Sequence, residues 1–294
     1  MRAETLPRPI AADLLTLTKP RITLLVVLTT AAAYVVATDG ALDWPRLVHT
    51  LVGTALVAAG SGALNQYVER ELDRLMRRTA DRPLPAGRLT PDVALAFGVL
   101  LAATGLLQLT LAVNPLTAAV GAATLLAYVF VYTPAKRWSA LATIVGAFPG
   151  AAPPVMGWTA VTGRLELGAW LLFALLFLWQ LPHFLAIAWM YRDDYRAAGM
   201  PVLTLGDPDG ARTGRQALLY AAALLPVSLT PAAVGISGKI YLVGALACGL
   251  VFLAFAFRFA RRVSKPTARQ LLLASVVYLP AVLGAMVVDH HFRL

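Results

Sequence analysis

The sequence predicts an all-α polytopic membrane protein with about nine transmembrane helices around a central cavity open to the cytoplasmic side. Composition is the first reason: 59% of the 294 residues are hydrophobic, only 14% are charged, and the mean hydropathy is +0.71. Long apolar runs separated by short polar segments are the second. Since lipid tolerates only helices or closed barrels, and the sequence lacks the alternation of a barrel, the runs are expected to be helices.

The expected spans follow one another along most of the chain. They cover residues 22–38, 47–67, 92–113, 115–133, 139–160, 167–190, 216–236, 240–260 and 270–289. Thr90-Pro91 and Asn114-Pro115 each place a capping residue before a proline, which favours a helix start. Residues 1–21 are expected to be a cytoplasmic tail with a short amphipathic stretch, Ile10–Leu17, and residues 22–294 one transmembrane domain. The segment before the first span is too long and too acidic for a cleaved signal peptide, so the span is expected to be retained.

Positive charge falls in alternate loops. With the N-terminus inside, 21 of the 25 Lys and Arg residues lie on the inner side, and Arg46, Arg164, Lys239 and Arg293 lie outside. The positive-inside rule therefore places the N-terminus in the cytoplasm and the C-terminus outside a cytoplasmic (inner) membrane. The net charge of +10 then reflects membrane orientation, and it does not indicate a nucleic-acid partner. The single cysteine, Cys248, excludes an intrachain disulfide.

A row of polar residues emerges from the second apolar run. Asn65, Glu69 and Asp73 recur every fourth position, so a continuous helix would place them on one face. Such a row can hold Mg²⁺, which binds one or two carboxylates and leaves its other positions to water and phosphates. Arg78 and Arg82 follow and can bind phosphate oxygens. The pattern suggests a diphosphate held through Mg²⁺; the alternative is a solvated helix stabilised by ion pairs along its surface.

A second charged segment lies in the other long inner loop. Asp193 and Asp194 stand between Tyr191 and Tyr195 at the inner end of the sixth span, which suggests a weak internal duplication of the first motif. Two ordinary cytoplasmic loops are the alternative.

Three further features are expected near the same side of the membrane. Tyr132 is followed by Lys136 and Arg137, which are either phosphate contacts or interfacial anchors. His183 follows Pro182 in a polar interruption of the sixth span, and it is either a ligand-binding or a packed residue. The fifth span carries three glycines and three prolines, which indicate either a wall opened for a flat ligand or a kinked packing helix.

Several of these stretches match a known family in sequence order. They are Leu17-Thr18-Lys19-Pro20-Arg21, Asn65-Gln66-Tyr67-Val68-Glu69 with Asp73, Arg78-Thr79 with Arg82-Pro83-Leu84-Pro85, Tyr132-Thr133, Pro149-Gly150 with Pro153-Pro154 and Gly157-Trp158, Trp179-Gln180-Leu181-Pro182-His183-Phe184, and Asp194-Tyr195 with Gly199. With these stretches the chain resembles the UbiA superfamily of intramembrane prenyltransferases. The run from Trp179 to Phe184 and the Asp194-Tyr195 pair resemble the branch of that superfamily that modifies haem.

The resemblance implies a reaction and roles for the site residues. Farnesyl diphosphate would donate a farnesyl group to a vinyl group of haem b, water would add, and haem O would result. Mg²⁺ would be bound by the carboxylates and the amide, the cations would bind diphosphate, Tyr132 would stabilise positive charge, and His183 would contact haem. The Mg²⁺ set is Asn65, Glu69, Asp73, Asp193 and Asp194, and the diphosphate set is Arg78, Arg82, Lys136 and Arg137. The resemblance also implies membrane lipid as a partner, with haem A synthase or a terminal oxidase as an assembly partner.

Two alternatives stay open on the sequence. Quinone-type relatives have two well-spaced aspartates in the second motif, whereas tyrosines flank Asp193 and Asp194 here, and Glu69 stands where many relatives have aspartate. The haem-modifying branch has these substitutions, so the resemblance favours that branch. An aromatic or quinone-precursor prenyltransferase of the same superfamily is the nearest alternative. A membrane transporter is the alternative from another class, although polar residues would then be expected through both halves of the membrane.

Overall fold

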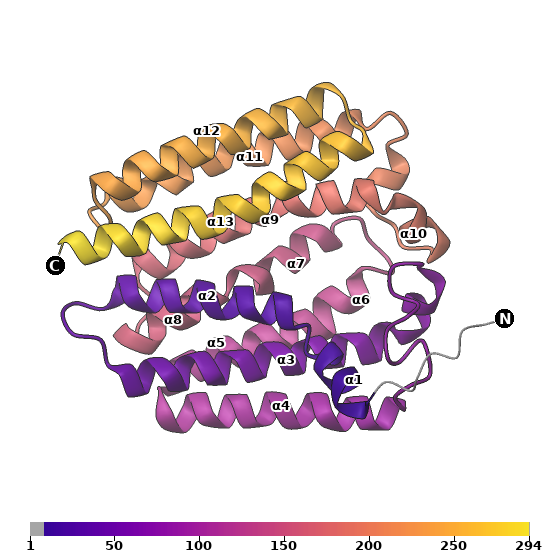
Figure 1. Ribbon diagram of the computed structural model, residues 1–294, viewed down its shortest axis with the longest axis horizontal. Coiled ribbons are helices and arrows are strands. Elements are labelled where there is room, and N and C mark those ends of the chain that lie inside the picture. The colour runs from indigo at the N-terminus through magenta and orange to yellow at the C-terminus, as the bar shows by residue number, and fades with distance from the viewer. Residues whose placement is uncertain (1–8, 294) are drawn as a thin grey trace.

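The computed structural model describes residues 9–293, and the all-α prediction is confirmed, because helices and no strands occur in that range (Figure 1). The described part contains eight helices long and apolar enough to cross a membrane. They are α2 (Pro20–Ala37), α3 (Trp44–Leu75), α4 (Pro91–Ala112), the continuous run of α5 (Pro115–Leu126), η1 (Ala127–Tyr132) and α6 (Thr133–Ala135), then α9 (Leu167–Met190), α11 (Ala211–Ala233), α12 (Lys239–Arg261) and α13 (Lys265–Arg293). Shorter helices are α1 (Ile10–Leu17), α7 (Ala142–Ala151), α8 (Pro153–Thr162), α10 (Arg192–Ala197) and the 3₁₀ turn η2 (Leu203–Gly206). Arg2 and Arg8 of the predicted tail lie outside the described residues.

The predicted fifth span, residues 139–160, forms two helices in place of one. α7 ends at Ala151 and α8 begins at Pro153, and each has ten residues. A ten-residue helix is about 15 Å long, which is roughly half the hydrocarbon thickness of a bilayer. The exact count of nine continuous spans is therefore not confirmed.

α3 is longer than the apolar run that predicts it. It has 32 residues, so at 1.5 Å per residue it is roughly 48 Å long and exceeds the hydrocarbon core of about 30 Å. The helix therefore continues beyond residue 67, where the expected span ends, to Leu75. The loop that follows, residues 76–90, lies at the same end of the bundle as α10, on the right in Figure 1. We call this the charged end.

Helices that are close together and helices that are far apart in sequence both pack side by side in the bundle. α3 packs against α4, α2 packs against α8, and α9 contacts both α11 and α13 (Figure 1). Gly157 of α8 permits the contact with α2, because a Cβ there would collide with the carbonyl oxygen of Thr30. α9 runs as a single helix through Pro182, so the predicted interruption does not break it.

Asp207 fixes the start of α11 at the charged end. Its carboxylate accepts hydrogen bonds from the backbone N–H of Arg212 and from the backbone N–H and hydroxyl of Thr213. Burial raises the pKa of Asp207, but these donors outweigh burial and hold the pKa below its ordinary value. The carboxylate therefore remains ionised and satisfies the orphan N–H groups of the helix.

Candidate active site

A cavity of about 460 Å³ lies inside the bundle, within the size range of small-molecule sites. Its charged lining comes from α3, from the residue before α2, from the residue after α6 and from the loop after α3. Its apolar lining includes Leu25 and Val26 of α2, Val57 of α3 and Met156 of α8. The cavity thus combines a charged mouth with a hydrophobic depth.

The row predicted on α3 faces this cavity. Asn65, Glu69 and Asp73 all line it, and their exposed fractions are 1%, 5% and 1%. Burying two carboxylates this deeply is costly unless they find partners. The structure therefore rejects the alternative of a solvated surface helix for these three residues. Glu71, which is exposed and pairs with Arg74, fits that description instead.

Each member of the row binds a cation from another segment. Lys19 Nζ donates to Asn65 Oδ1 at 2.6 Å, and Lys136 Nζ donates to Glu69 Oε1 at 2.6 Å. Arg82 Nη1 donates to Asp73 Oδ2, also at 2.6 Å. The three cations line the cavity as well, so the mouth is a set of opposite charges already held at hydrogen-bonding distance.

Lys19 also belongs to the site, although the sequence analysis gave it no role. It precedes α2 in a left-handed conformation with φ of 50°, which is rare for a residue with a side chain. Such strain persists only where the surroundings hold it, and it is common at functional sites. Here the Nζ lies against Asn65 and 5.8 Å from the centre of the Tyr128 ring. The signal in the sequence was a lysine next to the proline that opens an apolar span.

A π-helical turn brings two tyrosines to the cavity. In η1 the turns are wider than in an α-helix, and both Tyr128 and Tyr132 line the cavity with ring centres 5.4 Å apart. Gly146 of α7 makes room for Tyr132, because a Cβ at that position would collide with its ring. This glycine of the predicted fifth span therefore serves to seat an aromatic side chain.

Lys136 lies where α6 ends and joins these tyrosines to the α3 row. Its Nζ is 4.4 Å from the centre of the Tyr132 ring as well as bonded to Glu69. Burial alone would lower the pKa of Lys136, but Tyr132 and Glu69 raise it above its ordinary value. Lys136 therefore carries a positive charge at neutral pH. The neighbouring Arg137 is exposed and donates to the Val68 carbonyl oxygen, and it does not line the cavity.

The loop after α3 meets the segment that joins α10 to α11 at the charged end of the cavity. Met76 of the loop after α3 packs with Ala198 and Met200, which follow α10. The Arg78 guanidinium lies 5.0 Å from the ring centre of Tyr191 and 6.0 Å from that of Tyr195. The tyrosines that flank the second acidic pair thus hold an arginine of the loop after α3.

The predicted second acidic pair is not brought to the α3 row. Asp193 is exposed and pairs with Arg196 and Lys265, and neither Asp193 nor Asp194 lines the cavity. Among the described residues, no group of three or more His, Cys, Asp or Glu side chains lies close enough to hold a metal ion. α10 turns away after α9 ends, so closeness to a helix end in sequence did not set the direction of these side chains.

The α3 residues on their own suit one Mg²⁺ ion. Asp73 Oδ1 is a buried carboxylate oxygen without a hydrogen-bond partner, which is costly in a protein interior. With Glu69 and the Asn65 amide it offers the oxygen ligands, including two carboxylates, that Mg²⁺ prefers. The donor set therefore fits a hard divalent cation.

His183 lies on α9, on the wall of the cavity. Its Nδ1 is 2.7 Å from Ser275 Oγ of α13, and its ring lies 5.4 Å from that of Trp179. His183 thus lines the same cavity as the α3 row, from a different helix.

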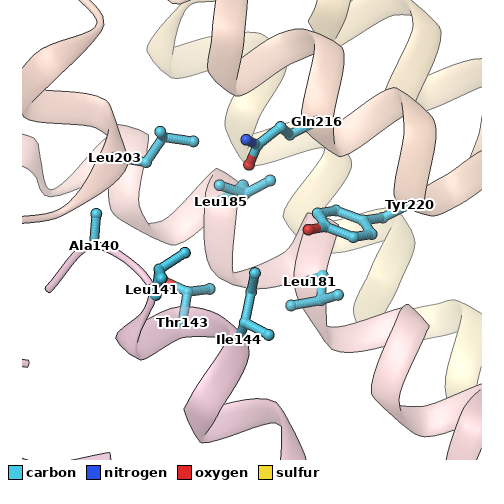
Figure 2. A pocket seen from close by; sticks show the side chains of 9 residues that line it. All are labelled: Ala140, Leu141, Thr143, Ile144, Leu181, Leu185, Leu203, Gln216 and Tyr220. Atoms are coloured by element: carbon cyan, nitrogen blue, oxygen red, sulfur yellow. The ribbon is translucent and has the colours of Figure 1, made fainter. Parts of the chain in front are cut away.

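A second pocket, of about 70 Å³, lies between α7, α9 and α11 (Figure 2). Leu181 and Leu185 of α9 face Gln216 and Tyr220 of α11 there. It has room for only two or so water molecules at roughly 30 Å³ each, and it has no carboxylate or cation in its lining. The larger cavity is therefore the candidate site.

Comparison with known proteins agrees with this arrangement. Residues 26–287 match the UbiA prenyltransferase family. A protein named protoheme IX farnesyltransferase from Solibacter usitatus is 50% identical over 286 residues, covering 94% of this chain and 98% of the relative. One of the same name from Myxococcus xanthus is 45% identical over 289 residues, covering 98% and 97%.

Solved structures share the fold at low sequence identity. One described as digeranylgeranylglyceryl phosphate synthase has a TM-score of 0.80 at 18% identity, covering 97% of this chain and 99% of the other. A UbiA homolog from Archaeoglobus fulgidus bound to GPP and Mg²⁺ has a TM-score of 0.66 at 15% identity, covering 93% and 99%. At these identities the likeness shows the fold alone.

Proposed function

Because the chain belongs to the UbiA prenyltransferase family and is therefore a prenyltransferase, we propose that it farnesylates haem. The reaction transfers the farnesyl group of farnesyl diphosphate to a vinyl group of haem b, with addition of water, and gives haem O. The transporter alternative does not hold for a member of this enzyme family. The names of the relatives at 50% and 45% identity support the choice of both substrates.

One observation carries the proposal: a buried amide–carboxylate row meets three cations at the charged end of a cavity whose depth is apolar. A prenyl diphosphate has a matching polarity, since its head is highly charged and its tail is hydrocarbon. The cations suit phosphate oxygens and the carboxylates suit the metal that accompanies them. The apolar wall suits the isoprenoid chain.

Asn65, Glu69 and Asp73 would hold Mg²⁺. The bound ion would neutralise charge on the diphosphate and make it a better leaving group. Asp193 and Asp194 would have to turn toward α3 to join these residues, so the proposal rests on the α3 residues alone. Arg137 lies outside the cavity and is not included.

Four cations would receive the diphosphate: Lys19, Arg78, Arg82 and Lys136, all of which line the cavity. Three of them already bind the α3 row, so substrate binding would exchange partners. The α3 oxygens would turn to the metal and the cations to the phosphates. Positive charge would then face the oxygen on which negative charge develops as the C–O bond breaks, and the electron pair would leave with the diphosphate.

The allylic cation left behind would react with the haem vinyl group. A C–C bond forms from the vinyl π electrons, and the new cation beside the ring takes up water and loses a proton to solvent. Tyr132 would stabilise the allylic cation through its ring. Because Lys136 occupies one face of that ring, the cation would approach the other face. The loops joined by Arg78, Tyr191 and Tyr195 would limit access of water before the C–C bond forms.

We further propose that residues 22–294 form one transmembrane domain in the cytoplasmic membrane, with the charged end in the cytoplasm. The excess of positive residues at that end supports this orientation. The product would pass to haem A synthase or to a terminal oxidase, which are the assembly partners we expect.

The test is to express the chain in membranes, add farnesyl diphosphate, Mg²⁺ and haem b, and separate the extracted haems by chromatography. A more hydrophobic haem carrying a hydroxyethylfarnesyl group is expected. If haem b returns unchanged while 4-hydroxybenzoate is prenylated, the chain is a quinone-precursor prenyltransferase and the proposal fails.

A further inference from the structure

Ser275 of α13 touches His183 although 92 positions separate them in sequence. The serine is fully buried, and its Oγ lies 2.7 Å from His183 Nδ1. The histidine lines the cavity, whereas the serine does not. Ser275 therefore acts on the site only through the imidazole ring.

The hydrogen bonds of Ser275 assign the proton on that ring. A serine hydroxyl has one proton, and here Oγ donates it to the Leu272 carbonyl oxygen at 2.6 Å. Toward His183 the same Oγ can only accept, so His183 Nδ1 must be the donor. A neutral imidazole with its proton on Nδ1 has a lone pair on Nε2.

The position of this pair of side chains is fixed from both helices. The Trp179 indole N–H donates to the Ser275 carbonyl oxygen at 2.8 Å, and the Trp179 ring lies beside the imidazole at 31° to its plane. No hydrogen bond of His183 Nε2 to another side chain or to the backbone occurs within residues 9–293. The ring thus offers the cavity one unprotonated nitrogen.

Histidines that bind metals usually show this arrangement, in which the second ring nitrogen donates to a fixed acceptor that sets tautomer and orientation. We infer that Ser275 is a positioning residue that holds His183 with its proton on Nδ1, so that the Nε2 lone pair would bind the iron of a haem in the cavity. The identity of the iron ligand rests on the proposed function; the tautomer does not.

The first experiment measures the tautomer in the substrate-free protein. Histidine labelled with ¹⁵N is incorporated, and the His183 signals are assigned by their loss in His183→Gln, since only three other histidines occur. We expect a protonated Nδ1 and an unprotonated Nε2 in the wild type, a mixture in Ser275→Ala, and the wild-type pattern in Ser275→Thr, which keeps the hydroxyl. A proton on Nε2 in the wild type would overturn the inference, whatever the activity.

The second experiment measures binding of haem b by absorption spectroscopy. His183→Ala should lose the spectrum of an imidazole-ligated haem, and added imidazole should restore it. Ser275→Ala should weaken haem binding by about 10- to 100-fold, the usual effect of losing such a partner. Ser228→Ala is the control, because Ser228 is a buried serine of α11 that does not line the cavity and whose hydroxyl donates to the Leu225 carbonyl oxygen.

Binding of a farnesyl diphosphate analogue should be retained in every variant, which shows that each one folds. A haem spectrum that is the same in His183→Ala and the wild type would overturn the assignment of the ligand. Failure of prenyl transfer with the expected tautomer and spectrum would instead overturn the proposed function and leave this inference standing.

Discussion

Asp73 is the side chain whose replacement should most sharply separate a metal–diphosphate site from a structural ion pair. Asp73→Asn keeps the shape of the side chain and removes its charge. At 2.6 Å the attraction between Asp73 and Arg82 is about 6 kcal/mol at an effective dielectric constant near 20, before the desolvation of both groups is subtracted. Arg82 is 26% exposed and can turn to water, so the loss of stability should stay below the roughly 3–5 kcal/mol typical of fully buried pairs.

The effect on catalysis should be larger. The α3 row has two carboxylates, so the substitution removes half of its formal negative charge and the charge on the orphaned Oδ1. We expect turnover to fall by at least about 10³-fold, or roughly 4 kcal/mol of activation free energy, as is found when a group that stabilises developing charge is removed.

The assay uses membranes with farnesyl diphosphate and haem b over a range of buffered Mg²⁺ concentrations, and it quantifies both the modified haem and the released diphosphate. Glu71→Gln is the matched control, because Glu71 lies on the same helix but is exposed and pairs with Arg74. This control should keep near wild-type turnover. Turnover of Asp73→Asn above about one tenth of wild type, or an equal loss in Glu71→Gln, would refute the metal-binding role of the α3 row. Asp73 would then be only the partner of Arg82 in a structural ion pair.

Three further outcomes follow from contacts near the charged end. Asp207→Ala should destabilise the protein at pH 7 by about 1 kcal/mol, the usual cost of removing a side chain that caps the start of a helix. Because the folded-state pKa of Asp207 is lowered, its stabilisation is present above the unfolded-state pKa of about 3.9 and is lost as the pH falls through the folded-state pKa. Thermal unfolding in detergent should therefore show the difference from wild type shrinking below about pH 4. Gly146→Ala should displace the Tyr132 ring and lower turnover. Gly284→Ala is the control and should keep wild-type turnover, because Gly284 is helical and has open space around it. Equal turnover of the two variants would contradict the contact between Gly146 and the Tyr132 ring. Tyr195→Leu should raise the KM for farnesyl diphosphate by about 2- to 5-fold, because it removes a cation–π contact of roughly 0.5–1 kcal/mol with Arg78. Tyr195→Phe keeps the ring and should keep the wild-type KM. A KM that is unchanged in Tyr195→Leu would show that the ring does not hold Arg78.

The α3 row could be predicted from sequence because its geometry is local. Residues four apart share a face of any helix, and the apolar run before Asn65 predicted the helix. The same reasoning could not predict the partners, since Lys19 reaches Asn65 from 46 positions away and Lys136 reaches Glu69 from 67. Such pairs depend on how helices pack.

Other differences have equally physical causes. Pro153 was read as part of a kinked span, but as the first residue of α8 it suits a helix start, and the chain uses it to begin a new helix. Pro182 was expected to distort its helix, yet α9 accommodates it within the bundle. Asp193 and Asp194 were expected at the site from the resemblance and from their position just after the sixth span, but closeness to the end of a helix does not determine the face from which they project.

The π-helical turn η1 has a consequence for how the length of this chain can change. A π turn is equivalent to one residue inserted into an α-helix, with the register on both sides preserved. One residue of an α-helix corresponds to about 100° of rotation, so a deletion within α5 would swing Lys136 away from Glu69. Deleting Phe130, whose side chain faces outward with 69% exposure, would let η1 close to an ordinary α turn instead. Lys136 would then keep its place, while Tyr128 and Tyr132 would shift relative to each other. The position of the two rings can therefore change by the loss or gain of a single codon, without a change in the charged residues at the mouth of the cavity.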